Sequence, residues 1–157
     1  TEAISIVLNK TKKLKFVLVG DGSLCNKMKN DLDSSRVLFK GHMERGELKE
    51  IYNIMRLLVL PSKHEGVPKV VLEAGMCGTP SLVTPVGGIN DIIKQGETGF
   101  IINSLSPRKI ATEMISAIES DKLKEISARI HNKWTTKFSK QMATQRYVDN
   151  VLENLYG

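Results

Sequence analysis

Residues 57–84 read LLVLPSKHEGVPKVVLEAGMCGTPSLVT, and the fold is decided by the pattern in this stretch. An apolar run at residues 57–60 stops at a proline, a helical pattern fills residues 69–77, and a second apolar run occupies residues 80–84. Two short buried strands joined through a helix are typical of a β-α-β unit, in which the strands are parallel. The stretch therefore predicts two parallel strands with a helix between them.

The same alternation continues on both sides of this stretch. Three further strands are predicted at residues 14–19, 36–40 and 99–102, because each run is short and rich in β-branched or aromatic residues. We expect an α/β fold of the Rossmann type, with a parallel sheet, helices on both of its faces and a helical carboxyl-terminal tail. Helices in the tail are predicted at residues 107–119, 121–138 and 140–156.

The composition is that of one globular domain over residues 1–157. Hydrophobic residues make up 41% of the chain and charged residues 25%, and no apolar run approaches the roughly 20 residues of a membrane-spanning helix. The net charge of +6 comes from basic residues that are spread out and not interleaved with aromatic ones, so we expect no nucleic-acid partner. Cys25 and Cys77 belong to no Cys/His cluster, so no metal site is expected.

The loop at residues 61–68 is the strongest candidate for a binding site. Ligands of parallel sheets bind where strands end and loops lead into helices, and here a helix is expected to start at Pro68. The first N–H groups of a helix attract anions such as phosphate, and Gly66 leaves the backbone open to a ligand. Glu65 and Glu73 cannot bind phosphate, but carboxylates accept hydrogen bonds from sugar hydroxyls. Together these features predict a nucleotide-sugar site.

This loop and helix resemble the signature of the family-four (group 1) retaining glycosyltransferases of the GT-B fold. Seven residues separate Glu65 from Glu73 within the pattern Pro-Ser-x-x-Glu-Gly-x-Pro-x-x-x-Leu-Glu-Ala. The resemblance extends in order over nearly the whole chain, which makes it far more specific than two spaced glutamates. Further matching segments are VLVGDG at residues 17–22, VLFKG at 37–41, GTP at 78–80, TPVGG at 84–88 and GETGF at 96–100.

The resemblance implies roles for individual residues. Glu65 is similar to the catalytic-site acid that contacts the hydroxyls of the donor sugar, and Glu73 to the acid that holds the ribose. The family transfers sugar with retention of anomeric configuration, usually without a metal, and uses no cofactor beyond the nucleotide-sugar substrate. The remaining donor contacts implied are Gly66, Val67, Lys69 and Val70 near the helix start, and Gly41, His42 and Met43 in a loop that meets the nucleobase.

Other conspicuous loop residues have ordinary explanations. We interpret His64 as a solvated loop histidine and residues 20–22, Gly-Asp-Gly, as a strand-to-helix turn. The pair Gly87 and Gly88 is expected to form a turn near the cleft. Asp91 departs from the family pattern, which usually has a glutamate there.

The resemblance also implies parts that residues 1–157 do not contain. The donor domain of the family begins with a central strand and a loop whose arginine and lysine bind the diphosphate, and an acceptor-binding domain precedes it. We therefore expect this chain to be a fragment of a longer enzyme and to be inactive alone. The expected function is transfer of a hexosyl unit from a UDP- or GDP-linked sugar to a glycan or lipid-linked acceptor, in polysaccharide or cell-envelope biosynthesis.

Three alternatives remain open at this level. The chain could be a nucleotide-sugar epimerase of the same fold, or a non-catalytic nucleotide-binding or scaffold module. Its basic surface could also bind nucleic acid or an anionic membrane, although no motif supports this. The expected location is the cytoplasm or the inner face of the membrane, with peripheral membrane association of the full-length enzyme.

Overall fold

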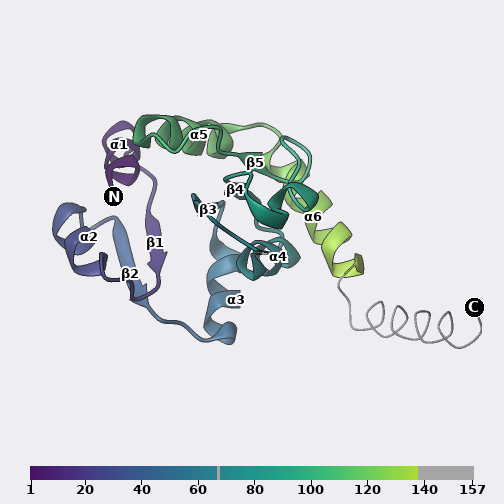
Figure 1. Cartoon of the computed structure of the whole chain (residues 1–157), viewed down its shortest axis with the longest axis horizontal. Coiled ribbons are helices and arrows are strands. Elements are labelled where there is room, and N and C mark those ends of the chain that lie inside the picture. The colour runs from purple at the N-terminus through teal and green to yellow at the C-terminus, as the bar shows by residue number, and fades with distance from the viewer. Residues whose placement is uncertain (67, 138–157) are drawn as a thin grey trace, which may run out of the picture.

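The computed structural model describes residues 1–66 and 68–137 (Figure 1). Val67 and the helix expected at residues 140–156 lie outside the described residues. In chain order the elements are α1 (Glu2–Lys10), β1 (Phe16–Val19), α2 (Cys25–Asp31), β2 (Val37–Gly41), α3 (Arg45–Ile54), β3 (Leu58–Leu60), α4 (Lys69–Met76), β4 (Ser81–Val83), the 3-10 helix η1 (Gly87–Asp91), β5 (Phe100–Ile101), α5 (Pro107–Glu119) and α6 (Leu123–Lys137).

The five strands form two parallel sheets within the described part of the chain. β1 pairs with β2, and β4 lies between β3 and β5. The α/β Rossmann-like class is confirmed, with the strands divided between two sheets instead of one continuous sheet. The reason is that no described strand pairs with the second edge of β1 or of β3, and these two edges face each other in Figure 1.

The larger core surrounds the sheet of β3, β4 and β5. All three residues of β4 are buried, because this strand has a neighbour on each side and helices packed against it. In α4 a glycine, Gly75, allows close helix packing: a Cβ atom there would lie 1.8 Å from the ring of Trp134 in α6. Sixteen buried side chains from both strands and helices, α1 and α6 included, belong to this core among the described residues.

The sheet of β1 and β2 has a much smaller core. Four buried residues form it: Ile4, Leu8, Leu32 and Val37. Because α1 contributes Ile4 and Leu8 here and Val7 to the larger core, this helix joins the two parts. Its packing on α5 is seen in Figure 1.

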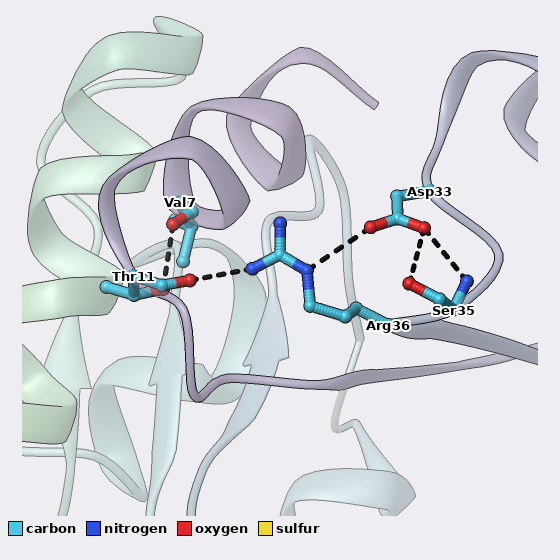
Figure 2. A network of polar contacts seen from close by, with 5 residues as sticks. All are labelled: Val7, Thr11, Asp33, Ser35 and Arg36. Atoms are coloured by element: carbon cyan, nitrogen blue, oxygen red, sulfur yellow. Dashed lines mark hydrogen bonds and ion pairs between the residues drawn. The ribbon is translucent and has the colours of Figure 1, made fainter.

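Polar contacts add a second connection between α1 and the start of β2 (Figure 2). The Arg36 guanidinium donates to the Thr11 carbonyl oxygen over 2.8 Å, and its Nε lies 3.3 Å from Asp33 Oδ2. Asp33 Oδ1 accepts from the backbone N–H and the hydroxyl of Ser35. These contacts lower the pKa of Asp33 from 3.8, with the Ser35 hydroxyl as the largest cause. The two-stranded sheet is thus fixed at its amino edge by an exposed polar network.

None of the described helices is both long and apolar enough to cross a membrane.

Candidate functional site

The candidate site lies where the strands end and the loops turn toward the helices. The loop after β3 leads into α4 and carries Glu65 and Gly66. β2 ends at Gly41, and the loop that follows it into α3 carries His42 and Met43; Gly41, His42 and Met43 together are called the Gly41 loop below. Both loops follow parallel strands at their carboxyl ends, which is the edge that the sequence predicts for a ligand site.

Glu65 is held in place by the loop that carries it. The Ser62 hydroxyl donates to Glu65 Oε1 over 2.6 Å, and the Thr84 hydroxyl donates in turn to the Ser62 carbonyl oxygen. Thr84 is buried directly after β4, so the end of this strand supports the loop. The carboxylate is half-buried, with one oxygen engaged by Ser62 and further lone pairs available to a ligand.

Gly87 and Gly88 pack directly against this loop, a role beyond the turn that the sequence predicts. The Gly88 N–H donates to the Gly66 carbonyl oxygen over 2.9 Å. A Cβ atom on Gly87, whose φ is +58°, would lie 1.9 Å from the Glu65 carbonyl oxygen. Only glycine permits this approach, so Gly87 and Gly88 fix how closely the backbone of the Glu65 loop packs against η1. A Cβ atom on Gly66 would meet nothing within 4 Å, and its face is open to a ligand.

The start of α4 leaves its first N–H groups available. Pro68 stands at the N-cap, no side chain caps the helix there, and the first turn contains no acidic residue. Lys69 is exposed at the first helical position and Val70 is half-buried. An uncapped helix start carries partial positive charge and suits an anion. Val67, the fourth residue predicted for this contact, lies outside the described residues.

Glu73 lies in the second turn of α4 and faces two residues of α3 that the sequence analysis missed. The first is Arg45, whose Nε lies 3.8 Å from Glu73 Oε1. The second is Tyr52, which is buried. Burial raises the pKa of Tyr52 to about 12, and the negative charge of Glu73 contributes to this rise. Because α3 and α4 are adjacent only in three dimensions, sequence spacing gave no signal for either contact.

The Gly41 loop is anchored by Asp21. The His42 N–H donates to Asp21 Oδ2 over 2.8 Å, and the Gly20 N–H donates to the Gly41 carbonyl oxygen over 2.7 Å. Gly41 has a φ of +64°, and a Cβ atom there would lie 2.8 Å from Asp21 Oδ1. Asp21 is therefore more than part of a turn: it positions the neighbouring loop. The His42 side chain is exposed.

A different hollow, of about 960 Å³, lies at the opposite edge, where the strands begin. It is bordered by the end of α1, by α5 and by Gln95 and Gly96 before β5. None of the residues predicted for the site borders it.

Within residues 1–66 and 68–137, no group of three His, Cys, Asp or Glu side chains is placed to hold a metal ion.

Characterised proteins of similar sequence transfer sugars. The chain is 27% identical over 148 residues to the sulfoquinovosyl transferase of Arabidopsis thaliana, covering 92% of this chain and 29% of that protein. It is 31% identical over 127 residues to UDP-Gal:alpha-D-GlcNAc-diphosphoundecaprenol alpha-1,3-galactosyltransferase of Escherichia coli. This match covers 79% of this chain and 33% of that protein. The chain thus spans about a third of the length of these relatives.

The fold is also that of solved glycosyltransferases. The pneumococcal O-GlcNAc transferase in complex with UDP and GlcNAc matches with a TM-score of 0.81 at 21% identity, over 99% of this chain and 32% of that one. The family model described as "Glycosyl transferases group 1" matches residues 1–154. This match agrees with the order of the loops along the chain. It also agrees with the positions of Glu65, in the loop after β3, and Glu73, in the helix α4. The chain belongs to the group 1 glycosyltransferase family.

Proposed function

We propose that this chain forms the donor-binding part of a retaining glycosyltransferase. The reaction would move a hexosyl unit from a UDP- or GDP-linked sugar to a glycan or lipid-linked acceptor. One observation carries the proposal: the half-buried residues Glu65 and Glu73 precede and follow, along the chain, a helix start that no side chain caps. An anion site between two acids suits a ligand that contains both a diphosphate and sugar hydroxyls.

Each part of this arrangement would have its own task. The start of α4 would receive the diphosphate and stabilise the negative charge that grows on it as its bond to the sugar breaks. Glu73 would accept hydrogen bonds from the ribose hydroxyls. Glu65, oriented by Ser62, would accept them from the donor sugar and hold its anomeric carbon toward the acceptor. The Gly41 loop would meet the nucleobase. This scheme assigns no task to a metal ion or a cofactor.

The relatives suggest which donors to try first. The name of the Escherichia coli relative gives a UDP-linked galactose as its donor and a lipid diphosphate glycan as its acceptor. The pneumococcal structure contains UDP and GlcNAc. By analogy, UDP-sugars are the first probes for this protein and GDP-sugars the second. A lipid-linked acceptor would place the reaction at a membrane surface, for which we propose the inner face, and fractionation of cells tests whether the protein is found with the membranes.

We further propose that the complete donor site needs residues outside this chain. Support comes from one edge each of β1 and β3, with which no strand of residues 1–66 and 68–137 pairs, so that each edge could accept a further strand. Such a strand would end beside α4 and its loop could supply the basic groups for the diphosphate. We expect the isolated chain to bind nucleotide-sugars weakly in calorimetry and to show no transfer. Tight binding with turnover by the isolated chain would refute this.

Replacement of Glu65 tests the proposed activity. In the full-length gene product, Glu65→Ala should lower kcat/KM for sugar transfer by about 100-fold or more, because contacts that form in the transition state are lost. The melting temperature should stay within about 2 °C, since the side chain is half-buried and makes one hydrogen bond. A non-catalytic module would show no transfer in either form, and an epimerase would convert the nucleotide-sugar without an acceptor.

A further inference from the structure

We propose that Thr84 is a positioning residue for Glu65, that it acts through Ser62, and that it thereby sets how well the protein binds the sugar part of its donor. The inference rests on the proposed role of Glu65 at the donor sugar. Thr84 follows β4 directly, whereas Ser62 and Glu65 lie in the loop after β3. The inference thus extends the site from the loop that carries the acid to the strand that supports this loop.

Thr84 is fixed by the core of the larger sheet. It is 4% exposed, and Val83 before it is fully buried. The Thr84 backbone N–H donates to the Leu60 carbonyl oxygen over 3.4 Å, which continues the pairing of β3 with β4 by one residue. Threonine is branched at Cβ, so few side-chain conformations are open to it in such surroundings. The core therefore determines the direction of the Thr84 hydroxyl.

The Thr84 hydroxyl holds the backbone of the loop that carries the acid. It donates to the Ser62 carbonyl oxygen, two residues beyond Leu60 on the same segment. A buried hydroxyl that lost its partner would be costly, so this contact is firm. Its two contacts let Thr84 hold the chain at the point where β3 ends and the loop begins.

Ser62 transmits this position to the carboxylate. Its own hydroxyl donates to Glu65 Oε1 over 2.6 Å. Hydrogen bonds from a hydroxyl to a carboxylate are short and strong, because the charge of the acceptor assists them. If the Ser62 backbone shifts, the hydroxyl that holds Glu65 shifts with it. The hydroxyl of Thr84 is therefore two contacts away from the acid, and both contacts are hydrogen bonds.

The segment that follows Thr84 holds the same loop on its other side. The Gly88 N–H donates to the Gly66 carbonyl oxygen, and Gly87 approaches the Glu65 carbonyl oxygen closely. These contacts act on the backbone of the loop, whereas the contact through Ser62 acts on the carboxylate itself. Thr84 therefore governs the direction of the acid as well as the place of the loop.

Thr79 is the matched control at the other end of β4. It is 2% exposed and lies before the strand, at the edge away from Glu65. Its hydroxyl donates to the Tyr52 carbonyl oxygen in α3. Thr79→Val and Thr84→Val each replace a buried hydroxyl by a methyl group and remove a donor from a carbonyl oxygen. Both should lower the melting temperature by about 2–5 °C, and only Thr84→Val should change recognition of the sugar.

The test is calorimetry on the full-length gene product. The probes are UDP-glucose, UDP-galactose and UDP-GlcNAc, each against UDP, and GDP-mannose against GDP. The affinity for a nucleotide-sugar divided by that for its nucleoside diphosphate, here called the sugar ratio, isolates the sugar because both ligands share the nucleotide. We expect Thr84→Val and Ser62→Ala to lower the sugar ratio by roughly three- to tenfold. Thr79→Val should leave it within about twofold, and Thr84→Ser, which keeps the hydroxyl, should restore most of it.

Several results would overturn the inference. They are a folded Thr84→Val protein with the sugar ratio of the wild type, an equal fall of the ratio in Thr79→Val, and a fall in Thr84→Ser as large as in Thr84→Val. Should Thr84→Val not fold, Ser62→Ala decides, and an unchanged ratio there contradicts the inference. Failure of the proposed function looks different: the wild type binds none of the nucleotide-sugars, or Glu65→Ala leaves the sugar ratio unchanged, and the inference then falls with it.

Discussion

The two sheets of the molecule differ sharply in how they are held. The sheet of β3, β4 and β5 lies in a core of sixteen buried residues and carries the loop and helix with Glu65 and Glu73. The sheet of β1 and β2 has four buried residues and carries the Gly41 loop. The acids of the candidate site thus stand on the strongly packed part, and the expected nucleobase loop stands on the weakly packed part.

This difference suggests that the two sheets serve different needs of the site. Local stability follows the density of buried apolar contacts, so the two-stranded part should open more readily than the three-stranded part. Groups that must be placed accurately for chemistry belong on the rigid part. The loop for the base instead depends on a few polar contacts, from Asp21 at the carboxyl edge and from Arg36 at the amino edge.

Truncation of one leucine in each sheet should show the largest contrast. Leu82 in β4 is 1% exposed, whereas Leu38 in β2 is 51% exposed. We expect Leu82→Ala to lower the free energy of unfolding by about 3–4 kcal/mol and Leu38→Ala by less than about 1 kcal/mol. Denaturant titration of the two variants measures both. Equal losses would contradict the proposed difference in packing.

A glycine pair tests the helix contact that supports Glu73. Gly75→Ala places a methyl group into the Trp134 ring, and we expect a loss of about 2–3 kcal/mol in the free energy of unfolding. Gly46→Ala in α3 is the control, because a Cβ atom there meets nothing within 4 Å and alanine favours a helix. Thermal unfolding should separate the variants clearly. A stable Gly75→Ala protein would mean that α4 and α6 are not in close contact.

Removal of the Asp21 anchor should have a smaller and local effect. Asp21→Ala removes the acceptor of the His42 N–H, so the loop after β2 should loosen at a cost of about 1 kcal/mol. Hydrogen exchange at the His42 amide should become faster, while exchange in α4 stays the same. Asp31→Ala, an exposed change in α2, is the control. Faster exchange throughout α4 would show that the two parts are not independent.

The smallest effect is expected from the exposed network of Figure 2. The pKa of Asp33 is lowered in the folded chain, so the charged form contributes stability at pH values above its ordinary 3.8. That contribution is lost as the pH falls through the lowered value. Asp33→Asn should therefore flatten the loss of stability below about pH 4, measured by thermal unfolding across pH. An unchanged profile would show that the network does not persist in solution.

The sequence predicted the elements better than their contacts. Strands such as β2 and β4 could be placed because apolar runs end at prolines and glycines, and the acids could be placed because strand, loop and helix follow one another locally. The contacts of Asp21 with His42 and of Gly87 with Glu65 join separate loops, and the ion pair of Arg45 with Glu73 joins two helices. No local pattern encodes them, since each depends on how the units pack. The division into two sheets likewise depends on which strands pair with each other, and the strand propensity of a segment does not reveal its partners.

Hydrogen exchange of the full-length gene product, with and without a UDP- or GDP-sugar that it binds, tests the central claim most directly. If the donor lies between the two acids, exchange should slow at residues 41–43, 65–66 and 69–73. It should not change around the hollow near Gln95 and Gly96. Protection at that hollow, with no change at residues 65–73, would contradict the assignment of Glu65 and Glu73 to the donor site.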